Sequence, residues 1–303
     1  MTAVAAGALA LGLLMTDGPA LGAGPSNGLS PTGPVREVTT AEQTRIDQAE
    51  QILIKGCMER QGFRYWVIAP LAPERLRAFE HPFVRDDLGW ARAHGYGGAI
   101  QRAFFATKKK DPNIAYRKSL TPTVRARYLT ALNGGSDSRR FSVRLPAAGS
   151  IRTAVGGCEL EARKKLYGDV EAYFRADKIA TNLIPLYAPR LMKDRRFTQA
   201  LHAWSQCMGR RAGRAYADPQ AVQSDLPGRT EGLSDRKADA LERKLAVAEA
   251  ICARTSTLAT TARHLDVEYG APVRRQYADD IRTGKRMRLA ALAEADTLRI
   301  TAN

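Results

Sequence analysis

Apolar residues recur three or four positions apart over most of this chain, which is the spacing of helices that bury one face. Two stripes that each end in a cysteine show it best: Ile46, Ala49, Leu53 and Cys57, and Phe197, Leu201, Trp204 and Cys207. The pattern predicts helices over about residues 40–61, 121–133, 157–177, 181–192, 195–209, 219–224, 235–267 and 272–300. We therefore expect an all-α fold.

Local signals set the ends of several of these helices. Thr40 and Gln43 have the spacing of a capping box for the first helix. Thr121 before Pro122 reads as a cap and first-turn pair. At the other end of the chain, Gly270-Ala271-Pro272 separates two long periodic segments, which predicts a C-terminal helical hairpin.

Two stretches lack helical periodicity. Residues 63–68 are apolar and aromatic and are bounded by Gly62 and Pro70, so they read as an extended segment that covers the core, or as one strand. Residues 134–157 are rich in Gly, Ser, Arg and Pro, which predicts the longest internal loop, exposed to solvent.

The first residues resemble a secretory signal peptide. Residues 3–15 form an apolar run, followed by the small residues of 20–23 and a Gly/Pro/Ser-rich stretch. No Lys or Arg precedes the run, so either the start codon has been placed too far downstream of the true one or the run is a buried N-terminal helix. The Gly/Pro/Ser-rich stretch that follows favours export. We expect a signal peptide over 1–23, a disordered lead over 24–38, and an irregular helical bundle of two halves, 39–180 and 181–303.

Four cysteines in an apparently exported chain predict two disulfides. Cys57 and Cys207 lie in related contexts, Cys-Met followed by Gly-x-x-Tyr, and Cys158 and Cys252 each lie on a later predicted helix. If the chain holds two diverged copies of one unit, each half closes on itself, which pairs Cys57 with Cys158 and Cys207 with Cys252. A zinc site or a redox thiol is the alternative, but the chain has no Cys-x-x-Cys pair.

Together with these motifs, Asn113-x-x-Tyr116, Gly156-Gly157-Cys158 and Trp204-x-x-Cys207-Met208 resemble a group of uncharacterised exported proteins of actinobacteria. The resemblance spans about residues 40–290. It implies an exported origin and paired cysteines, and no activity, cofactor or catalytic residue.

Charge points to anionic partners. The formal net charge is +16, and loss of residues 1–23, whose only charged side chain is Asp17, makes it +17. Outside a cell, wall polymers and lipid headgroups are the abundant polyanions, so we expect no nucleic acid partner. The densest basic run is Lys108, Lys109 and Lys110, a candidate polyanion site that could equally be a solvated face.

Common catalytic motifs are missing. The sequence contains no phosphate-binding loop, no Gly-x-Gly-x-x-Gly, no Gly-x-Ser-x-Gly and no His-Glu-x-x-His. The best remaining candidate is His94 beside the Gly95–Gly98 loop, for which a helix end is the simpler interpretation. The carboxylate pairs 86–87 and 279–280 read as solvated faces, and the three tryptophans read as core rather than as a sugar-stacking platform.

These observations favour a secreted, basic, non-enzymatic helical protein that associates with an anionic cell-wall polymer or an envelope protein. We expect no cofactor, no metal and no transmembrane span, and the oligomeric state stays open. Two alternatives are an extracellular envelope hydrolase with a dispersed active site, such as one using His94, and an accessory subunit of an export system.

Overall fold

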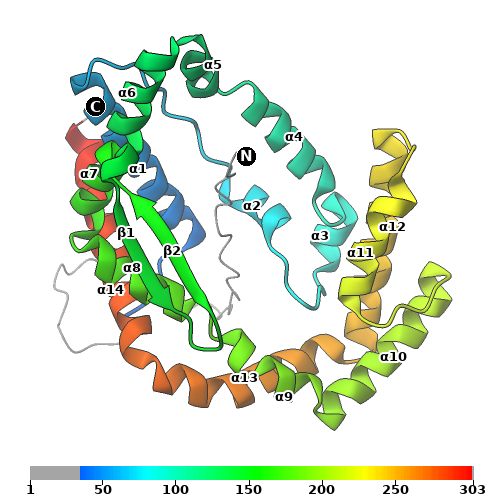
Figure 1. Ribbon diagram of the computed structural model, residues 1–303. Coiled ribbons are helices and arrows are strands. Elements are labelled where there is room, and N and C mark those ends of the chain that lie inside the picture. The colour runs from blue at the N-terminus through cyan, green and yellow to red at the C-terminus, as the bar shows by residue number, and fades with distance from the viewer. Residues whose placement is uncertain (1–34, 302–303) are drawn as a thin grey trace.

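The computed structural model describes residues 35–301 (Figure 1). The predicted signal peptide and most of the predicted lead lie outside these residues. The last part of that lead, residues 35–38, is irregular chain held against the C-terminal helix, where Glu37 forms ion pairs with Lys285 at 3.3 Å and Arg288 at 3.7 Å.

Helices make up most of the described chain, which confirms the predicted all-α class. They are α1 (Thr40–Arg60), α2 (Pro73–Leu76), α3 (Leu88–His94), α4 (Gly98–Lys109), α5 (Pro112–Ser119), α6 (Pro122–Asn133), α7 (Gly157–Tyr167), α8 (Val170–Ala180), α9 (Ala188–Met192), α10 (Arg195–Ala212), α11 (Pro219–Thr230), α12 (Asp235–Thr255), α13 (Leu258–Gln276) and α14 (Ala278–Thr301). Short 3-10 turns occur at Arg77–Phe79, Gly135–Asp137 and Ile184–Leu186. Two strands, β1 (Arg139–Arg144) and β2 (Ser150–Val155), complete the fold.

The first helix begins one residue earlier than its predicted capping box. Thr39 is the N-cap: its hydroxyl accepts from the Glu42 backbone N–H at 3.2 Å, and the Glu42 carboxylate accepts from the Thr39 N–H at 2.8 Å. Arg36 adds two further bonds to that carboxylate, at 2.7 and 2.8 Å. The charged Glu42 makes a stronger cap than the neutral Gln43 could, which explains the shift from Thr40.

The predicted loop over 134–157 is wrong, because most of it is an antiparallel hairpin. Arg139 pairs with Val155 and Arg144 with Ser150. Phe141 and Val143 point inward at 3% and 6% exposure, and they alternate with exposed polar residues. This two-residue period was present in the sequence, but the Gly- and Pro-containing turn and the flanking arginines obscured it.

The helices form two packed groups (Figure 1). One group contains α1, α6, α7, α8 and α14 with the hairpin, and the other contains α3, α10, α11 and α12. The sequence halves interleave between them, since α3 packs against α12 and α14 packs against α1, α7 and α8. α13 connects the two groups along one edge of the molecule.

The C-terminal helices break at positions other than those predicted. Gly270 and Pro272 lie inside α13, so the predicted joint between the hairpin helices is wrong. The chain instead turns at Thr257, a non-glycine residue with a φ of 60°, and again at Tyr277. Pro272 has no backbone N–H and so removes one hydrogen bond from α13. In the same helix, the Arg274 guanidinium donates to the Asp266 carbonyl at 2.8 Å.

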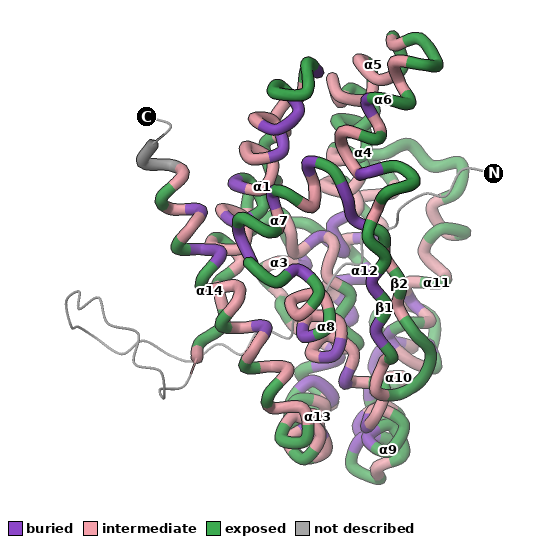
Figure 2. The backbone as a smooth tube through the Cα atoms, turned by 60° about the vertical axis from the view of Figure 1, so that its left-hand side comes forward, coloured by how far each residue is buried: buried purple, intermediate pink, exposed green. Residues whose placement is uncertain are grey.

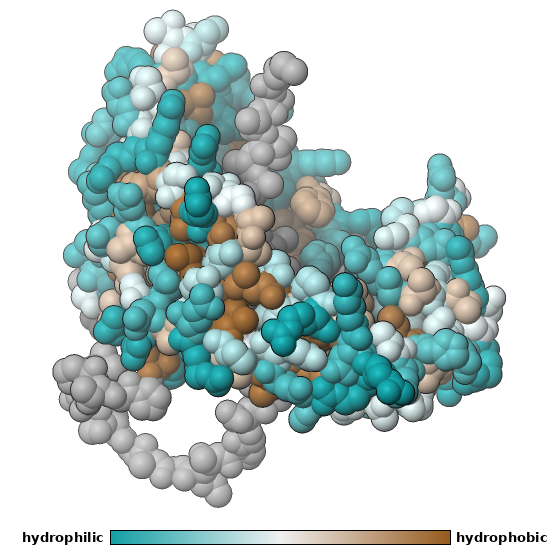
Figure 3. Space-filling model, turned by 60° about the horizontal axis from the view of Figure 1, so that its bottom comes forward, coloured by the Kyte–Doolittle hydropathy of each residue, from teal (hydrophilic) through white to brown (hydrophobic). Residues whose placement is uncertain are grey.

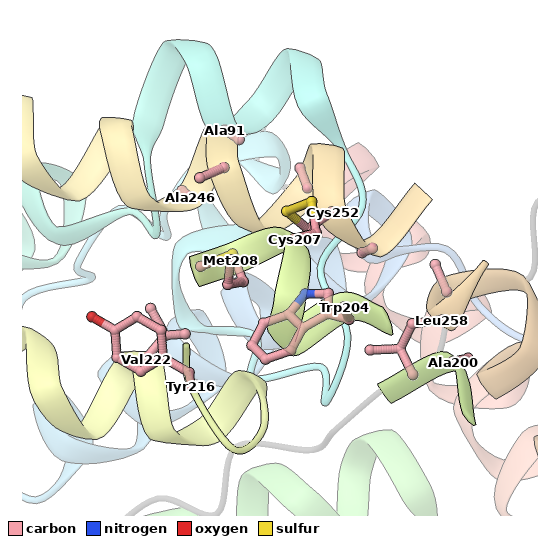
Figure 4. Close-up of a cluster of buried hydrophobic side chains, with 14 of the residues drawn as sticks. Ala91, Ala200, Trp204, Cys207, Met208, Tyr216, Val222, Ala246, Cys252 and Leu258 are labelled. Carbon is pink, nitrogen blue, oxygen red and sulfur yellow. A yellow bond between two sulfur atoms is a disulfide. The ribbon is translucent and has the colours of Figure 1, made fainter. Parts of the chain in front are cut away.

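Both disulfides have the predicted pairing. Cys57–Cys158 joins α1 to α7, and Cys207–Cys252 joins α10 to α12. Figure 4 shows the second disulfide within the largest core cluster, above Trp204 and beside Met208, both of which are fully buried. Each bridge therefore links two helices that already share a packed interface.

A close approach of α7 to the end of α6 depends on a glycine. Gly157 has a φ of +52°, and a Cβ there would collide with the Ala131 carbonyl oxygen. We expect Gly157→Ala to lower the free energy of unfolding by about 3 kcal/mol, from backbone strain plus the forced displacement. Urea denaturation would measure the loss. The matched control is Gly149→Ala, with a φ of +79° and open space around it, for which we expect about 1 kcal/mol; equal losses would contradict the close-approach argument.

Buried positions concentrate where helices face each other, while α4 and α5 contain none (Figure 2). The face seen in Figure 3 is mostly hydrophilic around one central group of hydrophobic side chains. Within residues 35–301, no helix is both long enough and apolar enough to span a membrane.

Candidate basic groove

The surface formed by α4, α5 and α6, residues 98–133, is strongly basic. It contains eight Lys and Arg residues and a single carboxylate, that of Asp111. That carboxylate caps the N-terminus of α5, where it accepts a hydrogen bond from the Asn113 backbone N–H at 2.8 Å. We call residues 98–133 the basic lobe. Its positive charge is almost uncompensated locally.

The predicted polyanion residues lie at the C-terminal end of α4 in this lobe. Lys108, Lys109 and Lys110 are all exposed. None of them forms an ion pair with any carboxylate of the described chain. Lys108 lies 5.4 Å from the centroid of the Phe104 ring, a cation–π distance. All three ammonium groups are therefore available to an external anion.

An open groove of about 370 Å³ lies beside Lys108. One wall comes from α1 with Asp47, Gln48 and Gln51, and the opposite wall comes from α4, α5 and α6. The extended segment of residues 65–71 forms a third side. The groove thus brings together α1, the extended segment and three further helices, and its volume falls within the size range of small-molecule sites.

The extended segment is fixed to both walls. The Asn113 side chain donates to the Trp66 carbonyl at 2.8 Å and accepts from the Trp66 N–H at 2.9 Å, as a paired strand would. Tyr65 donates from its hydroxyl to the Gln51 side-chain oxygen at 2.8 Å. Burial raises the pKa of Tyr65 to about 12, so this hydroxyl stays protonated at neutral pH. The prediction of an extended covering segment is correct here.

The loop that carried the candidate histidine has a structural role. Glu242 of α12, 6% exposed, accepts from the backbone N–H groups of Tyr96 at 2.7 Å and Gly98 at 2.8 Å. This carboxylate caps the N-terminus of α4, as a helix dipole favours. His94 itself is exposed and packs against the Trp90 ring at 4.4 Å. Within residues 35–301, no ion pair joins His94 to a carboxylate.

A second carboxylate below that loop is fully buried. Glu249 is 0% exposed, and its Oε2 accepts from the Tyr96 hydroxyl at 2.6 Å while its Oε1 has no partner among the described residues. Burial raises the pKa of Glu249 to about 7, although the Tyr96 bond and the Arg85 charge oppose the shift. Arg85 is also largely buried, which lowers its own pKa.

Sequence reasoning did not identify this buried carboxylate. Tyr96 and Glu249 are 153 residues apart, so no local motif joins them. The available signal was the spacing of Glu242 and Glu249, seven residues apart and therefore on one face of α12, next to its apolar stripe. Carboxylates on the buried face of a helix require hydrogen-bond donors, and here Tyr96 and Gly98 of the Gly-rich loop supply them.

The remaining sequence candidates are dispersed. Trp204 is buried in the core, whereas Trp66 and Trp90 are half-buried on other elements, so the three form no common platform. Asp86 pairs with Arg263 at 2.8 Å, and Asp87 caps α3 through the Trp90 N–H at 2.9 Å. Across the described residues, no group of three or more His, Cys, Asp and Glu side chains is placed to hold a metal ion.

Comparison of the chain with protein-family models, with curated proteins and with solved structures gives no match. The function is therefore argued from the residues of the basic lobe and its groove.

Proposed function

We propose that this is a secreted, non-enzymatic protein that binds an anionic polymer of the cell envelope through its basic lobe. The observation that carries the proposal is the run of Lys108, Lys109 and Lys110, exposed and without carboxylate partners in the described chain, within a lobe that has one occupied carboxylate. Such a cluster binds polyanions by releasing their condensed counterions.

Other features are compatible with this location. Two disulfides persist where the surroundings are oxidising, as they are outside the cytoplasm of most organisms. The acidic residues elsewhere are largely used in ion pairs, such as Asp194 with Arg196 at 2.8 Å and Asp86 with Arg263 at 2.8 Å. The lobe differs from the other basic surfaces in combining the longest run of consecutive lysines with a single carboxylate, which makes it the preferred contact for an anionic chain.

We expect retention of the purified protein on isolated cell walls to fall steeply with salt, because each phosphate or carboxylate contact releases counterions. Replacing Lys108, Lys109 and Lys110 by Gln together should weaken binding about tenfold or more at low ionic strength and flatten the salt dependence by roughly three contacts. A sedimentation assay across a salt series would measure both effects.

The control removes the same charge elsewhere. Arg195, Arg210 and Arg211 of α10 are exposed and form no ion pair with the described carboxylates. Their triple replacement by Gln should leave retention within about twofold of the wild type, since they lie outside the lobe. Equal losses in the two triple variants, or retention that ignores salt, would contradict the proposal.

A further inference from the structure

The groove beside Lys108 has an excess of free hydrogen-bond donors. Lys108 and Arg117 line it, and neither side chain has a hydrogen-bond or ion-pair partner in the described chain. Gln48 is likewise unpartnered, and Gln51 uses only its oxygen, for the Tyr65 hydroxyl. Two cations and two amide groups therefore face the groove with unused N–H groups.

The polar acceptors Asp47, Asp111 and Asn113 of the same groove each have at least one partner within the protein. Asp111 caps α5, Asn113 is bound to Trp66 on both of its polar atoms, and Asp47 accepts from the Gln43 side chain at 2.9 Å. Neither carboxylate pairs with Lys108 or Arg117, so a ligand that brings oxygen acceptors, at least one of them anionic, would satisfy these two cations.

The groove also has an apolar side. Phe104 and Tyr65 contribute aromatic rings to it, beside the cation and the amides. Aromatic faces pack against the C–H groups of sugars and polyols, whose hydroxyls bond to amides. An inorganic anion alone would leave these rings and the amides of Gln48 and Gln51 without contacts, and a hydrocarbon would leave the cations unpaired.

We propose that the groove binds one phosphorylated polyol unit, that is, a phosphate ester of a sugar or sugar alcohol. The phosphate faces Lys108 and Arg117, the hydroxyls face Gln48 and Gln51, and the carbon chain lies over Phe104. This inference deepens the proposed function: the lobe attracts the polymer by charge, and the groove recognises its repeating unit.

A matched neighbour makes the test specific, because Lys118, next to Arg117, is exposed and does not line the groove. With sn-glycerol 3-phosphate as the probe in isothermal titration calorimetry, we expect saturable binding of one molecule per chain. Lys108→Gln and Arg117→Gln should each weaken it about tenfold, as loss of a charge-assisted bond does, whereas Lys118→Gln should change it less than about twofold. Lys108→Arg should restore most of the affinity.

Two further probes identify the source of the ester. Tighter binding of a short poly(glycerol phosphate) oligomer than of sn-glycerol 3-phosphate supports the groove as a polymer site, and equal or weaker binding supports it as a site for the free ester. Inorganic phosphate that binds as tightly as the ester overturns the assignment of a polyol. Equal loss in Arg117→Gln and Lys118→Gln, or the absence of saturable binding, overturns the groove as the site. Wall retention that still depends on the three lysines would then leave the proposed function intact, so the two failures are distinguishable.

Discussion

Glu249→Gln will make the protein more stable at neutral pH, by up to about 3 kcal/mol. In the unfolded chain this carboxyl titrates near 4.5, and in the folded protein burial raises its pKa to about 7. Between these values the folded state binds the extra proton, so the wild type loses stability as pH rises from about 4.5 to about 7 and loses no more above that. Glutamine keeps the acceptor for the Tyr96 hydroxyl and has no charge to bury.

Urea denaturation at pH 4, 6 and 8 would measure this effect. The free energy of unfolding of Glu249→Gln minus that of the wild type should grow from near zero at pH 4 to its full value at pH 8. The groups that face Glu249 are the Tyr96 hydroxyl and the Arg85 guanidinium. If Arg85 compensates the carboxylate in full, Glu249→Gln will be the less stable protein at pH 8, and the argument from burial fails. Glu231→Gln, at an exposed position with no ion pair in the described chain, is the control and should show no such pH dependence.

Removal of either disulfide will cost about 4–5 kcal/mol of unfolding free energy on the chain-entropy estimate, which is among the largest single effects available in this fold. Cys57–Cys158 closes a separation of 101 residues and Cys207–Cys252 one of 45, so the first should cost slightly more. Alanine at both cysteines of one bridge avoids leaving a free thiol.

Equilibrium denaturation of the two double variants would give these losses, and thiol titration would verify that each retains its other bridge. The sum of the two losses approaches the whole stability of a typical domain. We therefore expect reduction of the wild type to unfold it near 37 °C. Variants as stable as the wild type would show that the packed interfaces of α1 with α7 and of α10 with α12 are sufficient alone.

Local periodicity predicted much of the fold. The cysteine-ended stripes became α1 and α10, and the Thr121-Pro122 signal marked the start of α6, because these features depend on neighbours three or four residues apart. The hairpin at 139–155 was missed because its alternation is short and its turn is rich in Gly and Pro. The prediction of a joint at Gly270-Ala271-Pro272 is wrong because tertiary packing, not propensity, carries α13 past these residues.

Only part of the candidate site could be predicted from the sequence. Lys108–Lys110 could be identified from the sequence as a charge cluster, but the groove beside it could not, because α1, residues 65–71, α5 and α6 meet there only in the folded chain. The buried Glu249 was hidden for a similar reason, since its partner Tyr96 comes from a distant loop. A run of charged residues is visible in the sequence, whereas a cavity or a buried carboxyl exists only where distant segments meet in the folded chain.

The packing of α14 against α1 also constrains the order in which the molecule can form. Ile46 of α1 is buried against Ala291 and Ala295, and Arg45 reaches Asp296 at 3.0 Å across 251 residues. The part of the first helix that faces α14 therefore stays uncovered until almost the whole polypeptide has been made, although α7 covers another part of it earlier, and closing so long a loop is slow. The interface between the first and the last helix therefore forms only once synthesis is nearly complete.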